Sequence, residues 1–123
     1  MKIFLLLLLN LINMNKIYKF VYGTYEASAV FEVDRDIFPE DLAKCTLEFF
    51  TWEYNKENNP VDEVLIKYAM EVIKIATFNN YNTIGVIDYF NDNEGFCRID
   101  GSKGIKLLSV TGYEFEEEYL QLI

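Results

Sequence analysis

Residues 60–78 have the sequence PVDEVLIKYAMEVIKIATF, in which apolar residues recur at the spacing of one helical face. Pro60 suits the first position of a helix, and Asn59 before it can cap the free backbone N–H groups. Burial of such side chains contributes about 1–3 kcal/mol each, so this helix is the expected centre of a single core. The apolar stripe comprises Val61, Val64, Leu65, Tyr68, Ala69, Val72, Ile73 and Ala76, and the polar face comprises Asp62, Glu63, Lys67, Glu71 and Lys74.

The segments on either side of this helix predict the rest of the fold. Lys16–Val33 alternates in polarity around a turn at Gly23, which predicts a β-hairpin. Pro39–Tyr54 predicts a first helix, whereas Thr83–Phe90 and Ile105–Thr111 predict a third and a fourth strand. The order β-β-α-α-β-β predicts an α+β fold, in which an antiparallel four-stranded sheet carries a helix pair packed on one face.

The predicted first helix is apolar around most of its circumference. Such a helix is either sandwiched between layers or exposes one side to a partner, and in a small domain we expect the sandwich. One face comprises Leu42, Cys45, Phe49 and Trp52, and Ala43, Leu47, Phe50 and Tyr54 extend it. If a side is exposed, the candidate secondary partner-binding residues are Phe49, Phe50, Trp52 and Tyr54.

The first thirteen residues, MKIFLLLLLNLIN, resemble a secretion signal only in part. No small-residue cleavage pattern follows the leucines, and the stretch is too short to cross a bilayer as a helix. We therefore expect residues 1–13 to be a leader created by an upstream-extended start, with Met14 as the true start and residues 14–123 as a single domain. A signal-like or lipid-associated segment is the alternative.

The charge and the residue inventory exclude several classes of function. A formal net charge of −9 disfavours direct binding to nucleic acid or to anionic membranes, and it favours either a basic partner surface or simple solubility. The chain contains no histidine, which removes Ser-His and Cys-His nucleophiles and histidine-based metal sites. Cys45 and Cys97 lie among apolar residues, so we expect buried, inert thiols, with their pairing left open. No catalytic residue, metal or cofactor is expected.

The irregular segment Asn91–Gly104, NDNEGFCRIDGSKG, is expected to be a hairpin connection. Asp92, Glu94 and Asp100 could supply oxygen ligands to calcium, but their spacing does not match that of an EF-hand loop. Arg98 and Asp100 predict no more than an ion pair within the loop.

The densest acidic patch lies near the C-terminus, where glutamates are interleaved with aromatic residues. This alternation is similar in charge and stacking surface to single-stranded nucleic acid, whereas the simpler interpretation is a solvated edge that discourages aggregation. The candidate partner-binding residues are Tyr113, Glu114, Phe115, Glu116, Glu117 and Glu118.

Several stretches resemble a family of small phage and prophage proteins that is defined only as a domain of unknown function. The resemblance covers residues 14–118 and rests on Tyr18–Phe38, Asn58–Thr77, Glu94–Val110 and the sequence TGYEFEEE. It implies a phage-associated protein in the cytoplasm of the host cell, and it supplies no catalytic residues.

These observations lead us to expect a non-enzymatic, acidic binding protein that occupies a basic surface of a host protein. By analogy with other small acidic phage proteins, the expected role is inhibition of a nucleic-acid-dependent host protein, in the manner of an anti-CRISPR protein acting on a CRISPR effector nuclease. The alternatives are a small-ligand-binding or hydrolytic domain that uses the loop at residues 91–104, and an oligomeric phage accessory protein.

Overall fold

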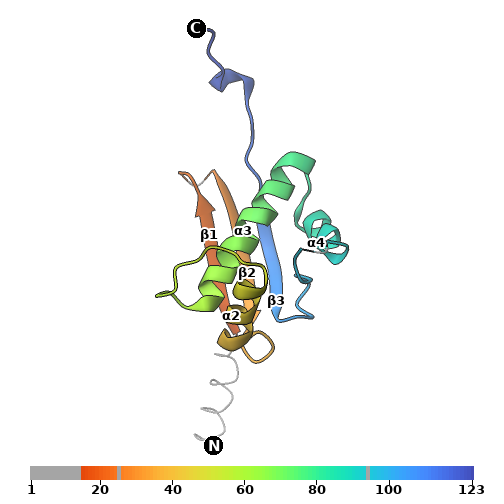
Figure 1. The fold of residues 1–123 in the computed structure, drawn as a ribbon. Coiled ribbons are helices and arrows are strands. Elements are labelled where there is room, and N and C mark those ends of the chain that lie inside the picture. Colours follow the sequence, from red (N-terminus) through yellow and green to blue (C-terminus); the bar gives the residue numbers. More distant parts are fainter. Residues whose placement is uncertain (1–14, 25, 94) are drawn as a thin grey trace, which may run out of the picture.

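The computed structural model describes residues 15–24, 26–93 and 95–123, and the leader discussed above lies outside this part of the chain. These residues form three strands and three helices, and Figure 1 shows that the C-terminal segment projects from them. In chain order the elements are β1 (Asn15–Tyr22), β2 (Ala27–Asp34), α2 (Glu40–Phe49), α3 (Pro60–Asn79), α4 (Thr83–Asn91), β3 (Ile105–Thr111) and a 3₁₀ turn at Glu117–Tyr119.

The three strands form one antiparallel sheet in the order β1-β2-β3. The predicted hairpin is confirmed, and its turn uses the positive φ of 64° at Gly23. Alternate side chains of β2 are buried, namely Ala27, Ala29, Phe31 and Val33, so this central strand supplies one face of the core.

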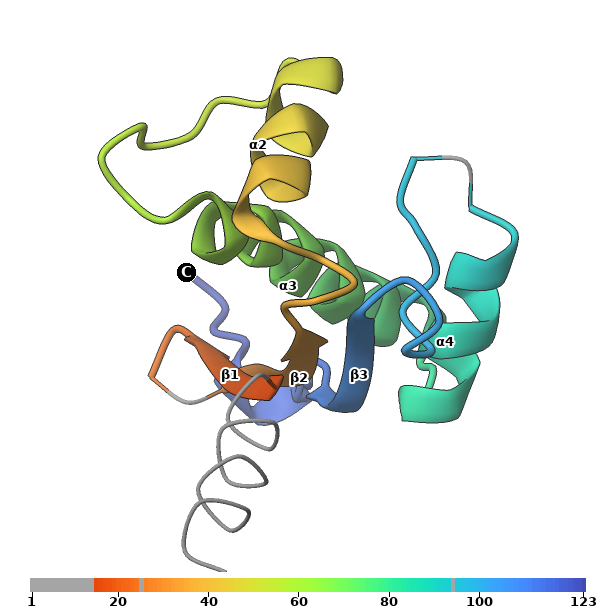
Figure 2. The same cartoon turned by 90° about the horizontal axis from the view of Figure 1, so that it is seen from below.

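Helix α3 lies across that face of the sheet and contacts β2 and β3 (Figure 2). It confirms the predicted central helix, since every residue of the predicted apolar stripe is buried. The Asn59 side chain accepts a 2.9 Å hydrogen bond from the Val61 N–H, as expected of a cap.

One prediction for α3 is wrong, because Glu63 does not lie on the exposed polar face. Its side chain is only 6% exposed, and its Oε1 accepts a 2.6 Å hydrogen bond from the Asn55 N–H. The carboxylate thus satisfies a backbone donor of the α2–α3 connection, a role that helical periodicity cannot reveal.

The predicted third strand is also wrong, because Thr83–Asn91 forms α4 and the described residues contribute three strands to the sheet. β-Branched and aromatic residues favour a strand there, but the Asn82 side chain caps a helix by accepting a 2.8 Å hydrogen bond from the Gly85 N–H. Val86 and Phe90 then bury one helical face. The Thr83 hydroxyl accepts a 3.1 Å hydrogen bond from the Val110 N–H of β3, so the start of α4 lies beside this strand and does not extend the sheet.

Helix α2 packs on α3, on the side away from the sheet, as Figure 2 shows. It buries only Ala43 and Leu47, while Leu42 is 44% and Phe49 80% exposed. The expected sandwich between layers is therefore wrong, because nothing among the described residues covers the outer side of this helix. The helix also ends earlier than predicted, at Phe49 rather than Tyr54. None of the described helices combines the length and the apolar composition needed to cross a bilayer.

Candidate partner-binding site

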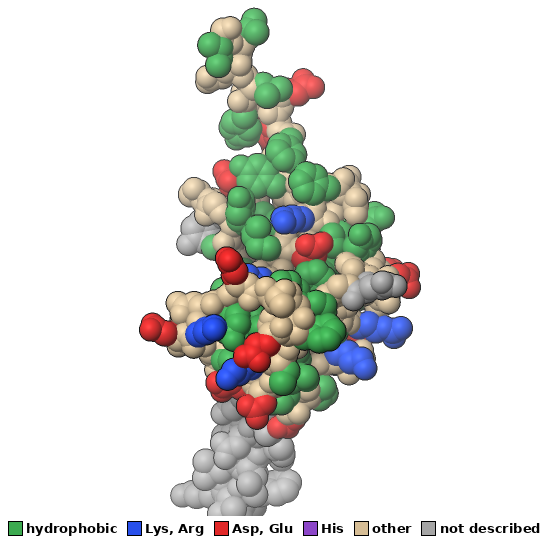
Figure 3. Space-filling model, in the orientation of Figure 1, with side chains coloured by type: hydrophobic (Ala, Val, Ile, Leu, Met, Phe, Trp, Pro, Cys, Tyr) green, Lys and Arg blue, Asp and Glu red, His purple; other side chains and the backbone are tan. Residues whose placement is uncertain are grey.

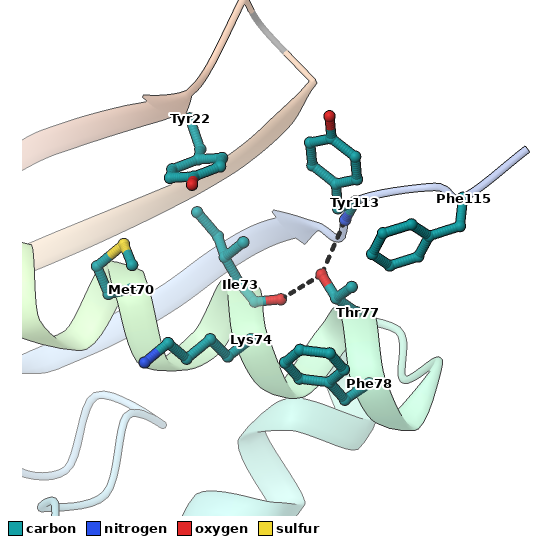
Figure 4. A pocket seen from close by; sticks show the side chains of 8 residues that line it. All are labelled: Tyr22, Met70, Ile73, Lys74, Thr77, Phe78, Tyr113 and Phe115. Atoms are coloured by element: carbon teal, nitrogen blue, oxygen red, sulfur yellow. Dashed lines mark hydrogen bonds between the residues drawn. The ribbon is translucent and has the colours of Figure 1, made fainter. Parts of the chain in front are cut away.

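The C-terminal tail, Tyr113–Ile123, is anchored where the chain leaves β3 and passes the end of α3. A Cβ atom on Gly112 would lie 2.9 Å from backbone atoms of Ala76 and Thr77, so this approach requires glycine. The Tyr113 N–H donates a 2.8 Å hydrogen bond to the Thr77 hydroxyl oxygen. That hydroxyl donates in turn to the Ile73 carbonyl at 2.7 Å (Figure 4). The first residue of the tail is thereby fixed to the central helix.

Aromatic packing extends this anchor. The Tyr113 ring lies edge-on to Tyr22, with centroids 6.5 Å apart, and 5.4 Å from the ring of Phe115. Side-chain hydrogen bonding with Glu26 raises the pKa of Tyr113 above its ordinary value. Beyond Tyr113 every residue is exposed, and Figure 1 shows the tail projecting from the body of the protein.

An apolar cavity of about 420 Å³ opens beside this anchor. Its lining includes side chains with large exposed fractions, such as Phe78 at 77% and Phe115 at 79%. Figure 3 shows apolar side chains gathered on this face where α3 meets the tail. The lining residues come from β1, α3 and the tail (Figure 4), and they are Tyr22, Met70, Ile73, Lys74, Thr77, Phe78, Tyr113 and Phe115.

A second, acidic cavity of about 860 Å³ adjoins the first, and Tyr113 and Phe115 line both. Hydrogen bonding with Glu118 raises the pKa of Glu116 above the ordinary value, as expected where carboxylates crowd together. The carboxylates that line the acidic cavity belong to Glu26, Glu114, Glu116 and Glu117.

The tail residues proposed from the sequence therefore lie around shared cavities, with Glu118 on the adjacent 3₁₀ turn. Sequence reasoning missed the residues that other elements contribute to this site. Met70, Lys74 and Phe78 follow one another at intervals of four on α3, a spacing that was visible in the sequence. No sequence signal indicated that Tyr22 and Glu26 of the hairpin would join them.

The secondary set of aromatic residues forms a row that leads into the core. Phe50 stacks on Trp52 at 4.8 Å, and Trp52 contacts Phe96 at 5.5 Å between ring centroids. Phe50, Trp52 and Tyr54 are partly buried, which leaves Phe49 as the freely exposed member of the set. The row begins where α2 ends, and Figure 1 shows α2 at the opposite end of the protein from the projecting tail.

The two cysteines have different environments, and both thiols are free. Cys97 is partly buried; its N–H donates to the Tyr68 hydroxyl at 3.1 Å, and its Sγ lies 2.9 Å from that oxygen. Burial raises the pKa of Cys97 and that of Tyr68. Cys45 is exposed, so its predicted burial is wrong, because α2 turns this residue away from α3.

The loop at residues 91–104 serves to connect α4 to β3. The Ile99 side chain is buried, and its carbonyl accepts a 2.9 Å hydrogen bond from the Leu107 N–H. Asp100 accepts hydrogen bonds from the N–H and hydroxyl of Ser102, which lower its pKa, with a smaller effect from Arg98. Within residues 15–24, 26–93 and 95–123, no three His, Cys, Asp or Glu side chains gather as a metal site would require; Glu94 lies outside these ranges.

Comparison with known proteins places the chain in a family. A family model described as "Protein of unknown function (DUF2528)" matches residues 28–122. The lambda prophage-derived protein ea10 of Escherichia coli O6:H1 (strain CFT073) and protein ea10 of Escherichia phage lambda are each 28% identical over 106 residues. These alignments cover 79% of this chain and 87% of each relative. No solved structure matches. The resemblance inferred from the sequence is thus confirmed.

Proposed function

The chain belongs to the DUF2528 family, a phage and prophage family of unknown function, and we propose that it binds a basic surface of a host protein through its C-terminal tail. The observation that carries this proposal is that the first residue of the tail is anchored to α3, whereas the acidic residues beyond it are exposed. Tyr113 is hydrogen-bonded to Thr77, whereas the glutamates that follow it are exposed.

Anchoring favours binding because an ordered attachment point reduces the conformational entropy that the tail loses when it engages a partner. The glutamates supply long-range attraction, which raises the association rate with a basic protein and falls as salt is added. The aromatic side chains of Tyr113 and Phe115 supply contact area that charge alone does not provide.

The class of partner that fits this tail is a protein with a nucleic-acid-binding surface. Such surfaces are basic, and they carry side chains that stack on planar groups such as nucleobases or aromatic rings. A CRISPR effector nuclease belongs to this class. No feature of the described residues favours such a nuclease over another basic protein. We therefore propose this class of partner and not a particular protein within it.

The test is capture of proteins from a bacterial lysate on the immobilised protein at low and at moderate salt. The variant Glu116→Lys/Glu117→Lys should lose most of the capture, and the capture by the wild type should weaken with salt. The matched control is Glu53→Lys/Glu57→Lys, which changes the net charge equally at exposed positions outside both cavities.

Equal loss in the two double variants would mean that net charge, and not the tail, controls binding. Capture that resists both salt and charge reversal, yet falls in Phe49→Ser, would reject the proposal and move the partner site to α2.

A further inference from the structure

The apolar cavity is a preformed depression with no occupant among the described residues. Its volume of about 420 Å³ exceeds that of one large side chain, and it lies within the range of about 300–1,000 Å³ typical of binding pockets. Met70 on its wall is 41% exposed, and Phe78 and Phe115 are exposed over more than three quarters of their surface. Water therefore contacts apolar surface that a ligand could cover.

The surroundings of the cavity select the chemistry of its occupant. Among the described residues, Lys74 is the one charged side chain that lines this cavity, whereas four glutamates line the adjoining acidic cavity. Tyr113 and Phe115 form the wall between the two cavities. If a partner segment places one apolar side chain in the apolar cavity, the side chains next to it in that segment therefore lie beside the carboxylates of the acidic cavity.

We propose that the apolar cavity binds a large apolar side chain of the partner protein, from a segment in which arginine or lysine flanks that residue. This inference rests on the proposed function and adds a specificity rule to it. Arginine fits the acidic cavity better than lysine, because its guanidinium pairs with carboxylates in two-point contacts and stacks on aromatic rings such as Tyr119.

Charge complementarity also argues against a second copy of the chain as the occupant. Each copy carries a net charge of −9, and a copy seated over this wall would bring acidic surface toward the glutamates of the acidic cavity. Like charges placed opposite each other disfavour association. A basic partner segment has no such cost.

The test uses two peptides of equal charge, acetyl-Arg-Gly-Leu-Gly-Arg-amide and acetyl-Arg-Gly-Ser-Gly-Arg-amide, titrated into the full chain. Binding is followed through the backbone amide resonances of Thr77 and Tyr113. The leucine peptide should bind about tenfold more tightly than the serine peptide, since burial of one leucine side chain contributes at least that factor.

The variant Phe78→Ser should remove this preference while keeping the attraction for arginine. Phe78 is mostly exposed, so the change should leave the fold intact, and Met70→Ser provides an independent second variant. The matched control is Ile84→Ser, an apolar residue that is 69% exposed on α4 and does not line the cavity.

Equal affinity for the two peptides, together with capture that still depends on Glu116 and Glu117, would overturn the inference and leave the proposed function standing. Loss of that charge dependence would overturn the proposed function itself. A concentration-dependent dimer in sedimentation that Phe78→Ser abolishes would assign the cavity to a second copy, which also overturns the inference.

Discussion

The Tyr113 N–H donates a 2.8 Å hydrogen bond to the Thr77 hydroxyl, so one side chain of α3 fixes the start of the C-terminal tail. The same hydroxyl donates to the carbonyl of Ile73 within its own helix. A single threonine thus satisfies a backbone donor that lies thirty-six positions further along the chain.

Replacement of Thr77 by valine should loosen the base of the tail. Thr77→Val keeps the shape but removes the acceptor for the Tyr113 N–H, which should lower the free energy of unfolding by about 0.5–2 kcal/mol. Urea unfolding and the hydrogen exchange of the Tyr113 amide measure this effect. Thr77→Ser retains the hydroxyl but lacks the methyl group and is the control; a loss that appears in Thr77→Ser and not in Thr77→Val would show that the methyl group, and not the hydrogen bond, is responsible.

A methyl group at position 112 should separate the tail from α3. In Gly112→Ala the new Cβ would meet backbone atoms of Ala76 and Thr77 at 2.9 Å, and backbone cannot move aside as a flexible side chain can. We expect a loss of about 1–3 kcal/mol in unfolding free energy. Gly95→Ala is the control, because its nearest contact would be 3.6 Å, and a comparable loss there would contradict the explanation.

Substitutions on the buried and on the polar face of α3 should lower the free energy of unfolding by very different amounts. Leu65 is fully buried, so Leu65→Ala should cost about 2–5 kcal/mol through lost burial and the cavity that remains. Lys67 lies on the polar face, and Lys67→Ala should cost less than about 0.5 kcal/mol. Chemical denaturation of both variants checks the assignment, which fails if the lysine variant is the less stable one.

The two thiols should differ in reactivity at pH 8. Cys45 is exposed and should react rapidly with a disulfide reagent, whereas burial raises the pKa of Cys97 and leaves little thiolate to react. The variants Cys45→Ser and Cys97→Ser assign the rates. Slow labelling in the Cys97→Ser protein would contradict the exposure of Cys45.

The same pKa shift predicts a loss of stability in alkaline solution. The folded state holds the Cys97 proton more tightly than the unfolded state, so stability is fully present below the thiol's ordinary pKa of about 8.5 and falls as the pH rises above it. Tyr68 adds a loss of the same sign above about pH 10. Melting temperatures measured from pH 7 to 10 should fall less steeply in Cys97→Ala than in the wild type.

Local sequence signals predicted those elements in which the apolar periodicity and the capping or turn residues indicate the same boundaries. The apolar stripe of α3, its Asn59 cap, the Gly23 turn of the hairpin and the strand Ile105–Thr111 were all predicted from residues near one another in the chain. Periodicity and capping act over a few residues, and they therefore remain visible without any knowledge of tertiary contacts.

Only the tertiary structure decided where the remaining segments pack and which surfaces stay open. Thr83–Asn91 is helical because Val86 and Phe90 pack into the core and Asn82 caps the helix, although its composition favours a strand. The apolar cavity joins Tyr22, one side of α3 and the start of the tail, which lie far apart in the sequence. Burial depends on which surfaces meet, and periodicity within one element carries no information about its neighbours. For that reason the sequence alone determined the central helix, the hairpin, the last strand and the acidic character of the tail, whereas the fold brought the tail and the apolar cavity together.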